Sequence, residues 1–336
     1  MSRPSSEVAA PSVRLAIDLG PYRFTPEVRA VLERSLGPID VRSGDQSRDA
    51  EFLLTEFVPK DVSVWPNLKL IQLTSAGIDH LEGHAVWRSS IPVATVSGIG
   101  HVSIAQYCLG MILNHYHCLP QAMTFGQTRV WPDRLKLASR TLRGANACIY
   151  GYGSIGRECG RLLSALRMNV LAVNRSGKPS RDDGYNAFPG TGDPEGSIPA
   201  AWYRSEDVGD AIAHAQVLLI TAPSSAATRG RIDGKMLARM PAGGFVVIVS
   251  RGGIIDENAL ADALRSGHLA GAAIDTFVKE PPPADHPLFG LPNAILTPHI
   301  SGVFDDYMGR IYPLLIENVR RVRRGQPPLN VVERTG

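Results

Sequence analysis

The chain has 336 residues, of which 44% are hydrophobic and 20% charged, and its formal net charge at pH 7 is +3. This length exceeds that of a usual single domain and predicts two hydrophobic cores. Acidic and basic residues are interspersed, which argues against a nucleic-acid partner, and no apolar run approaches membrane-spanning length. One basic cluster is typical of the solvated last turns of a helix: Arg320, Arg321, Arg323 and Arg324.

The cysteines and the first residues bear on the compartment. The four cysteines have no paired spacing and are predicted to be reduced core thiols of a cytoplasmic protein: Cys108, Cys118, Cys148 and Cys159. Residues 1–12 are polar and rich in Pro and Ser, without an apolar segment. We expect a disordered start there rather than a targeting signal.

The first hundred residues alternate strand-like runs with helix-like spacing. Helical spacing occurs at residues 26–35 and around 78–88. Four short apolar runs predict strands: Val13–Asp18, Glu51–Thr55, Leu68–Thr74 and Pro92–Val96. These elements predict a small α/β domain, followed by a long apolar helix from His101 to about Cys118.

A second series of strands and helices extends from Ala147 to about Pro298. Six strands are predicted, at residues 147–150, 169–173, 217–221, 245–249, 271–275 and 294–297. A helix at about 303–324 is long enough to return to the first domain. We therefore expect two Rossmann-like α/β domains with doubly wound parallel sheets. The first would be discontinuous (1–100 plus 301–336), the second would bind a nucleotide (101–300), and the active site would lie in the interdomain cleft.

A glycine-rich turn opens the second series. After the apolar strand at 147–150, Gly151-x-Gly153-x-x-Gly156 leads into a helix, in the sequence ACIYGYGSIGRECG. The first glycine allows a tight turn, the second lets a pyrophosphate approach the backbone, and the third lets the helix pack closely on the strand. Glycine is common in turns, but the strand–turn–helix–strand context favours a dinucleotide site.

Three polar residues follow predicted strands nearer the C-terminus. Arg251 comes after the apolar run Phe245–Val249, Glu280 lies on a Pro-rich corner, and His299 follows Pro298. Each alone is compatible with a bland role, as a structural cation, a solvated carboxylate or a loop histidine. Together, beside a dinucleotide motif, they indicate one catalytic cleft at the edge of a parallel sheet.

With these residues in view, the chain resembles the D-isomer-specific 2-hydroxyacid dehydrogenases from about Leu68 to Val332. The most specific stretches are RGGIIDENAL and DTFVKEPPPADHPLFGLPNAILTPHISG. The resemblance implies that Arg251, Glu280 and His299 are catalytic and that Asp275 holds the nicotinamide carboxamide. Arg251 and His299 would also contact the substrate, with the loop amides of Ser75, Ala76 and Gly77. The remaining implied cofactor residues are Gly151, Tyr152, Gly153, Ser154, Ile155, Gly156, Ala222, Pro223, Thr228, Ser250 and Gly302.

The resemblance implies hydride transfer between NAD(P)H and the C2 carbonyl of a small 2-keto acid, without a metal. It also implies a homodimer joined through the nucleotide domain, for which the arm around Trp131 is suited. Two departures, Ala105-Gln106 in the bridging helix and the segment Ala222–Thr228, put the substrate pocket in doubt. Two other functions stay open: a dehydrogenase for a phosphonate-bearing keto acid or another oxyanion, and a dinucleotide-sensing co-regulator.

The residues after the second strand of the nucleotide domain predict a preference for NADP(H), with NAD(H) also accepted. An acidic residue there normally binds the ribose of NAD. This chain has Asn174, which does not repel a 2′-phosphate, and then Arg175 and Ser176, which can donate to it. The alternative is a dual-specificity enzyme in which Asn174 binds the ribose and Arg175 faces solvent.

Three further features have bland interpretations. His115, His117 and Cys118 cluster without a fourth ligand or suitable spacing, which argues against a metal site. His101 is predicted to be a capping or exposed residue rather than a substrate contact. The segment Gly177–Pro199 is longer than most connections, and a tolerated surface insertion is favoured slightly over a flap on the cofactor.

Overall fold

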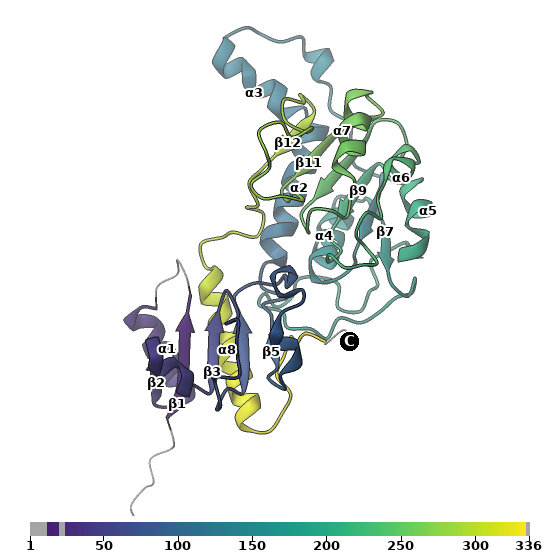
Figure 1. The fold of residues 1–336 in the computed structure, drawn as a ribbon. Coiled ribbons are helices and arrows are strands. Elements are labelled where there is room, and N and C mark those ends of the chain that lie inside the picture. Colours follow the sequence, from purple (N-terminus) through teal and green to yellow (C-terminus); the bar gives the residue numbers. More distant parts are fainter. Residues whose placement is uncertain (1–11, 20–23, 334–336) are drawn as a thin grey trace, which may run out of the picture. The chain divides into compact units, whose positions relative to one another are not determined.

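The computed structural model of the chain describes residues 12–19 and 24–333, which form two compact units (Figure 1). Unit 1 comprises Met1–Ile99, Gly184–Ala187 and Asp305–Gly336, and unit 2 comprises Gly100–Asp183 and Phe188–Phe304. The disorder expected for residues 1–12 lies, except for Ser12, outside the described residues. Across the described part of the chain, the helices are too short or too polar to cross a membrane.

Unit 1 contains a five-stranded parallel sheet in the order β2-β1-β3-β4-β5. Its central strands are buried at every position, because a parallel sheet is covered on both faces. Helices α1 (Pro26–Leu36) and α8 (Tyr307–Arg323) belong to this unit. The strands are β1 (Val13–Asp18), β2 (Ile39–Arg42), β3 (Phe52–Thr55), β4 (Leu70–Leu73) and β5 (Val93–Ala94).

Most of the elements predicted in unit 1 are confirmed, and two predictions were incomplete. Strand β2 was missed because IDVR is short and half polar. The helix-like spacing around 78–88 gives two short 3-10 helices, Asp79–Leu81 and Ala85–Arg88, because a turn at Gly83 with φ of 71° separates them. The sequence pattern therefore located the segment but not the type of helix.

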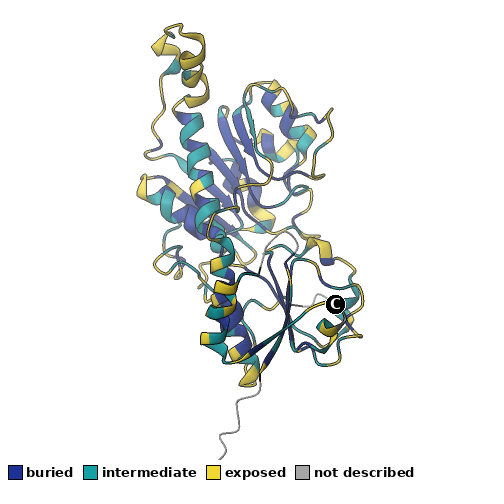
Figure 2. Cartoon of the chain, turned by 90° about the vertical axis from the view of Figure 1, so that its left-hand side faces the viewer, coloured by how far each residue is buried: buried dark blue, intermediate teal, exposed yellow. Residues whose placement is uncertain are grey.

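Unit 2 contains a seven-stranded parallel sheet in the order β12-β11-β10-β9-β6-β7-β8, almost wholly buried in its middle (Figure 2). All six predicted strands are present, and β8, at one edge of the sheet, was missed. The strands are β6 (Asn146–Tyr150), β7 (Asn169–Asn174), β8 (Ala201–Arg204), β9 (Val217–Ile220), β10 (Gly244–Ile248), β11 (Leu269–Ile274) and β12 (Ala294–Leu296). The helices are α2 (His101–Tyr116), α3 (Leu119–Thr128), α4 (Ser154–Ala165), α5 (Val208–Ile212), α6 (Gly234–Ala238) and α7 (Glu257–Arg265).

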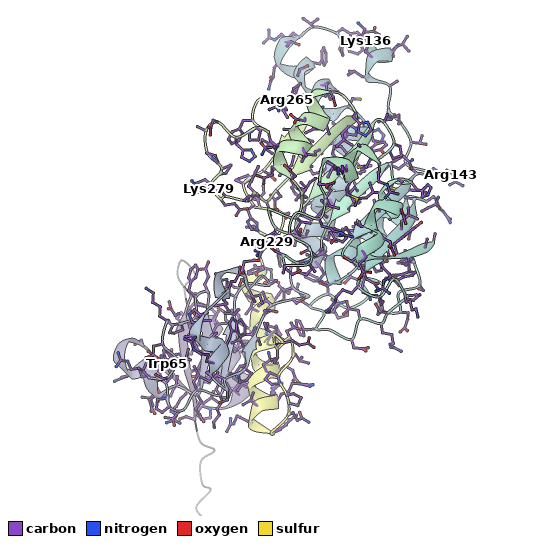
Figure 3. The ribbon with its side chains drawn as sticks, turned by 45° about the vertical axis from the view of Figure 1, so that its right-hand side comes forward. Trp65, Lys136, Arg143, Arg229, Arg265 and Lys279 are labelled. Atoms are coloured by element: carbon purple, nitrogen blue, oxygen red, sulfur yellow. The ribbon has the colours of Figure 1, made fainter. Side chains whose placement is uncertain are left out.

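An arm made of α3 and the residues up to 137 extends beyond this sheet, with Lys136 near its far end (Figures 1 and 3). Helix α3 has no buried residue. Large apolar side chains on the arm are exposed, including Trp131 at 70% and Leu135 at 87%. The arm therefore contributes nothing to the hydrophobic core of its own unit.

The basic cluster of α8 has a structural task that the sequence did not predict. Arg320 donates to the carbonyl oxygen of Ser35 at 2.7 Å, and Arg323 donates to that of Leu36 at 3.5 Å. These carbonyl groups lie at the end of α1, where they have no partner within the helix. Both arginines are exposed in the last turn of α8, as the sequence predicted, and their hydrogen bonds to α1 are an additional role.

A buried polar pair joins α8 to the sheet of unit 1. The amide nitrogen of Asn318 donates to the side-chain oxygen of Gln72 at 2.8 Å, and both residues are fully buried. The Asn318 side chain also binds the backbone of Leu329, accepting from its nitrogen at 2.6 Å. The Gln72 amide donates to carbonyl oxygens of the sheet. Every polar group of this pair therefore has a partner.

We predict that Asn318→Ala lowers the free energy of unfolding by roughly 2–4 kcal/mol, because each buried polar group left without a partner costs about 1–3 kcal/mol. Urea unfolding curves measure the change. The matched control is Glu317→Ala, which removes an exposed 3.9 Å ion pair with Arg321 on the same helix and should change stability by less than about 1 kcal/mol. Equal effects of the two substitutions would contradict the prediction.

Candidate functional site

The parallel strands of unit 2 bring the candidate residues to one edge of the sheet. Because all seven strands point the same way, the segments that follow them share that edge. The sheet order reverses between β9 and β6, where open α/β sheets bind their ligands. Across the sheet, the residues that follow the strands are His299 (β12), Asp275 (β11), Arg251 (β10), Ala222 (β9), Gly151 (β6) and Arg175 (β7).

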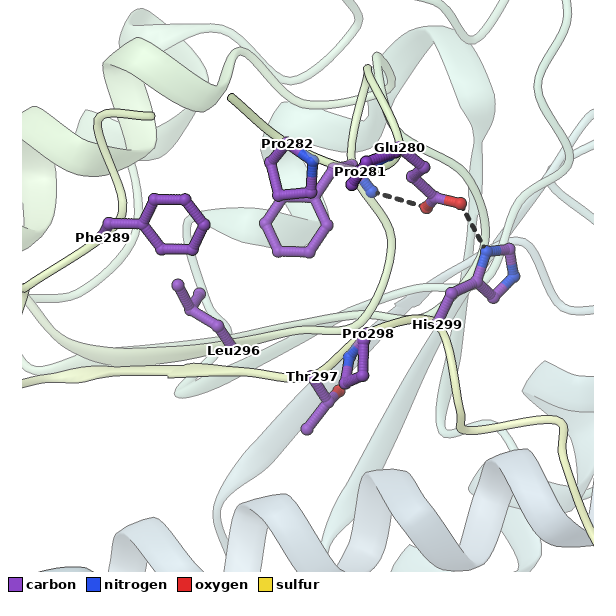
Figure 4. Close-up of a pocket in the computed structure, with 9 residues that line it drawn as sticks. Glu280, Pro281, Pro282, Phe289, Leu296, Thr297, Pro298 and His299 are labelled. Carbon is purple, nitrogen blue, oxygen red and sulfur yellow. Dashed lines mark hydrogen bonds and ion pairs between the residues drawn. The ribbon is translucent and has the colours of Figure 1, made fainter. Parts of the chain in front are cut away.

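His299 and Glu280 form a hydrogen-bonded pair. The His299 Nδ1 and Glu280 Oε2 atoms are 2.8 Å apart, and Glu280 Oε1 accepts from the backbone nitrogen of Phe277 at 3.0 Å (Figure 4). A carboxylate can only accept, so Nδ1 carries a proton and Nε2 is the ring atom that can gain or lose one. Both side chains remain partly exposed. The pair is therefore arranged for acid–base chemistry at Nε2.

The backbone at His299 is strained and is held by Asp275. His299 has a φ of 54°, a left-handed conformation that is uncommon outside glycine. The Asp275 carboxylate is fully buried and accepts from Thr297 Oγ1 at 2.6 Å and from the backbone nitrogens of Ile300 and Ser301 at 2.9 Å. This carboxylate thus binds the segment that carries His299, and the contact with the nicotinamide carboxamide that the resemblance implied stays a prediction.

A mainly apolar pocket of about 510 Å³ borders the pair. Its apolar walls come from two segments, and Figure 4 shows the imidazole at the opposite end from Phe289 and Leu296. The ring nitrogen that can exchange a proton thus lies away from the apolar end. The apolar lining residues are Phe277, Pro281, Pro282, Phe289, Leu296 and Pro298.

A second histidine–glutamate pair holds the segment that carries Glu280. Glu257, in the first turn of α7, accepts from His286 Nε2 at 3.0 Å and from the backbone nitrogen of Val278 at 2.8 Å. Both partners are largely buried. On the other side, a Cβ on Gly252 would lie 2.0 Å from the carbonyl carbon of Phe277. Sequence reasoning missed this support. Its signals in the sequence were the helix start at Asp256-Glu257 and Gly252, whose missing side chain lets the backbone at Phe277 approach.

Arg251 and Ser250 follow β10. The Arg251 guanidinium is partly buried and donates to the carbonyl oxygen of Ser250 at 2.8 Å. The Ser250 hydroxyl is buried and has no hydrogen-bond partner among the described residues. Such an orphan hydroxyl is a ready donor or acceptor for a bound ligand.

The glycine-rich turn fits a dinucleotide. Gly151 has a φ of 105°, and a Cβ there would lie 2.3 Å from the backbone nitrogen of Ala222. A Cβ on Gly156 would lie 2.4 Å from the Gly151 carbonyl oxygen, whereas a Cβ on Gly153 would meet nothing within 4 Å. The first and third glycines are thus required by packing, and the space beside the second is free for a pyrophosphate.

The other predicted cofactor residues surround this turn. Ser154 and Ile155 begin α4, and Tyr152 is buried beneath it. Thr228 closes the segment after β9 by donating to the carbonyl oxygen of Pro223 at 2.7 Å. Gly302 follows the His299 segment, with Ile104 of α2 beside it.

Asn174 is occupied by its own turn. Its amide nitrogen donates to the carbonyl oxygen of Lys178 at 2.9 Å, and its side-chain oxygen accepts from the backbone nitrogen of Gly177 at 2.7 Å and from Ser176 Oγ at 3.2 Å. Arg175, by contrast, is exposed. Arg204 at the end of β8 is in register with Asn174, and sequence reasoning missed it because β8 was missed.

The predicted substrate loop lies in unit 1, after β4. Ser75 Oγ donates to the carbonyl oxygen of Gly77 at 2.9 Å, and the Ser75 carbonyl accepts from Val96. Ala76 is exposed. The loop is therefore a closed turn fixed against the end of β5.

His115 and His101 are packed against other side chains of unit 2. His115 stacks on Phe245 at 4.2 Å, and burial, with the nearby Arg140, lowers its pKa to about 4. His101 was predicted to be exposed or capping; instead it is buried, and its Nε2 lies 2.8 Å from Thr191 Oγ1. Cys118 is only partly buried, unlike the other three cysteines. The described residues contain no group of three or more His, Cys, Asp or Glu side chains placed to hold a metal ion.

Comparison with known proteins identifies the family. Residues 109–301 match the model of the D-isomer specific 2-hydroxyacid dehydrogenase, NAD binding domain. The (S)-sulfolactate dehydrogenase of Chromohalobacter salexigens is 33% identical over 76% of this chain and 78% of its own length. The hydroxypyruvate reductase of Blautia hydrogenotrophica is 28% identical over 85% and 86%.

A similar solved structure is that of a D-isomer specific 2-hydroxyacid dehydrogenase from Xanthobacter autotrophicus Py2 in complex with NADPH and MES. It has a TM-score of 0.78 and 25% identity and covers 95% of this chain and 98% of its own. The expected fold class, with a Rossmann-like nucleotide domain, is confirmed. The chain belongs to the D-isomer specific 2-hydroxyacid dehydrogenase family and is an NAD(P)-dependent oxidoreductase.

Proposed function

We propose that this chain reduces the C2 carbonyl of a small 2-keto acid with NAD(P)H, or catalyses the reverse oxidation. The observation that carries the proposal is the His299–Glu280 pair, 2.8 Å apart, on the sheet edge that also holds Arg251 and the glycine-rich turn. Unit 2 would bind the cofactor and unit 1 would contribute to substrate binding. The sulfolactate dehydrogenase and hydroxypyruvate reductase relatives support a small hydroxy- or keto-acid substrate.

Each residue has a defined task in this proposal. The Arg251 guanidinium binds the substrate carboxylate through its planar fork and polarises the carbonyl group. The His299 Nε2 donates a proton to the carbonyl oxygen during reduction and accepts it back during oxidation. Glu280 keeps the proton on Nδ1 and stabilises the imidazolium. The bound nicotinamide supplies or accepts the hydride.

Other residues orient these groups. Asp275 holds the 297–301 segment and therefore the strained backbone of His299. We also propose that backbone amides of Ser75, Ala76 and Gly77 bind the substrate carboxylate. Ser250, whose buried hydroxyl has no partner among the described residues, is proposed to bind the cofactor.

His299 is the proposed proton donor, and Glu280 is its proposed partner. His299→Ala should reduce kcat by at least about a hundredfold while leaving NADPH binding nearly unchanged, because a general acid contributes about 10²–10⁴. Glu280→Gln should shift the pH optimum of reduction to lower pH, because a neutral amide stabilises the imidazolium less. Steady-state kinetics across pH with glyoxylate, hydroxypyruvate and phenylpyruvate measure both effects.

The control for this prediction is His117→Ala, because that side chain is exposed at the end of α2 and away from the pair. It should retain parental kinetics. Near-normal turnover in His299→Ala would exclude His299 as the proton donor. An unchanged pH profile in Glu280→Gln would exclude Glu280 as the residue that stabilises the imidazolium.

We further propose that NADPH is preferred over NADH. The bonds of Asn174 to Gly177 and Lys178 fix the turn that presents Arg175, and no carboxylate stands at this position to repel a 2′-phosphate. The exposed guanidinium of Arg175 and the Ser176 hydroxyl are the proposed phosphate donors. The relative solved with NADPH bound supports this choice of cofactor.

Arg175→Ala should lower kcat/KM for NADPH by about ten- to a hundredfold, because one charge-assisted hydrogen bond contributes that much to affinity. The kcat/KM for NADH should change little. Arg181→Ala removes another exposed arginine nearby in sequence and serves as the control. A parent enzyme that favours NADH would refute the proposed preference. If Arg175→Ala left the ratio of kcat/KM for NADPH to kcat/KM for NADH unchanged, Arg175 would not bind the phosphate.

We also propose that the chain forms a homodimer through unit 2, with the arm as the contact. The proposal is supported by the apolar side chains that the arm exposes, above all Trp131 and Leu135, since exposed apolar patches mark interaction surfaces. Replacing both residues by Glu should convert a dimer into a monomer in analytical ultracentrifugation. Lys136→Ala, on the same arm, should leave the assembly unchanged. A monomeric parent protein would contradict the proposal.

A further inference from the structure

The long insertion Gly177–Pro199 is a folded element of unit 2 over much of its length. Its two limbs lie against each other: the backbone nitrogen of Asp182 donates to the carbonyl oxygen of Pro194 at 2.9 Å, and a Cβ on Gly196 would lie 2.8 Å from the Ser180 carbonyl oxygen. Gly192 donates to Glu158 of α4 at 2.7 Å. The insertion therefore packs on α4, the helix that follows the glycine-rich turn.

Arg157 of α4 binds the insertion from a buried position. Arg157 is only 3% exposed, and its Nη1 donates to the Asp193 carbonyl oxygen at 2.5 Å. Its Nη2 donates to the carbonyl oxygen and hydroxyl of Ser180 at 2.8 and 3.1 Å, and its Nε lies 3.5 Å from Asp182. A buried guanidinium is tolerated only when such partners surround it. The insertion supplies these partners.

Asp193 connects the insertion to the glycine-rich turn. This carboxylate, in a residue only 4% exposed, accepts from the Tyr152 hydroxyl at 3.0 Å and from the backbone nitrogens of Ser197 and Ile198 at 2.9 and 3.1 Å. The buried Asp193 carboxylate thus orients both the insertion and Tyr152, which lies between Gly151 and Gly153. No part of the proposed hydride transfer requires this bond.

Tyr152 passes that constraint to the backbone of the turn. Its backbone nitrogen donates to the Val173 carbonyl at 3.2 Å, and its ring makes an edge contact with Trp202 at 5.1 Å. A Cβ on Gly160 would lie 2.6 Å from the Tyr152 oxygen, so the glycine leaves just enough room for the phenol. Burial and the neighbouring Asp193 raise the pKa of Tyr152, so the hydroxyl remains a donor.

We infer that Asp193 is a positioning residue for the dinucleotide: through the Tyr152 hydroxyl it holds the Gly151–Gly153 turn in the conformation that receives the pyrophosphate. A turn that is ordered in advance loses less conformational entropy when the ligand binds. The insertion is then part of the cofactor site, although it need not touch the cofactor. This inference rests on the proposed function, since it requires a dinucleotide at the turn.

The test compares Asp193→Asn and Tyr152→Phe with the parent enzyme and with Asp183→Asn. Tyr152→Phe keeps the packed ring and removes only the hydroxyl, and Asp183→Asn alters an 82% exposed carboxylate on the same insertion. Dissociation constants for NADPH and NADH are measured by fluorescence titration, and kcat and both KM values by kinetics. Loss of one buried hydrogen bond to a carboxylate should weaken cofactor binding by about tenfold.

The expected result is a similar rise in the dissociation constants for NADPH and NADH, because the pyrophosphate is common to both. The kcat at saturating cofactor and the KM of the keto acid should stay within about twofold, since only cofactor binding is altered. Asp183→Asn should behave as the parent. Arg175→Ala, in contrast, is expected to affect NADPH alone.

Three results would overturn the inference. Unchanged cofactor dissociation constants with a lowered Tm would show that Asp193 merely anchors the insertion, and the proposed function would stand. If Asp193→Asn and Tyr152→Phe changed only kcat or the keto-acid KM, Asp193 would not act through the glycine-rich turn. A parent protein that binds neither NADPH nor NADH would overturn the proposed function and this inference together.

Discussion

Seven strands of unit 2 run parallel, and this single constraint places every candidate group of the unit. A parallel pair requires a crossover between its strands, so each strand is followed by a segment at the same edge of the sheet. His299, Asp275 and Arg251 follow three adjacent strands, and the glycine-rich turn follows a fourth at the point where the order reverses. Residues that lie far apart in the chain thereby reach one edge of the sheet.

Buried carboxylates then fix the segments at this edge. Asp275 binds the segment that carries His299, Glu257 binds the one that carries Glu280, and Asp193 binds the glycine-rich turn. Each accepts from backbone nitrogens as well as from a side chain, and such charge-assisted bonds are stronger than neutral ones. The left-handed backbone conformation of His299 is maintained in this way, because the hydrogen bonds to Asp275 offset its strain. The proposed chemistry therefore depends on residues that carry out no step of it.

Selectivity between the two cofactors is expected from a turn rather than from a single side chain. Asn174 uses its oxygen and its nitrogen to close the turn at Gly177 and Lys178. Arg175 in this turn is exposed, and its charge suits a phosphate. Arg204, which the register places beside Asn174, adds a second cation near the same strand ends.

The sequence by itself determined most of the strands and helices of the two units, although not β2 or β8, together with the glycine-rich turn and the positions of Arg251, Glu280 and His299. These features depend on local periodicity, on turn residues and on motifs whose members lie close together in the chain. Only the tertiary structure decided what each group contacts. His286 reaches Glu257 across 29 positions, Asp193 reaches Tyr152 across 41, and Asn318 reaches Gln72 across 246. The burial of His101 and the docking of the insertion on α4 follow from such contacts. No pattern within one segment specifies them, because burial and hydrogen bonding between distant residues arise only when the sheet brings those residues together.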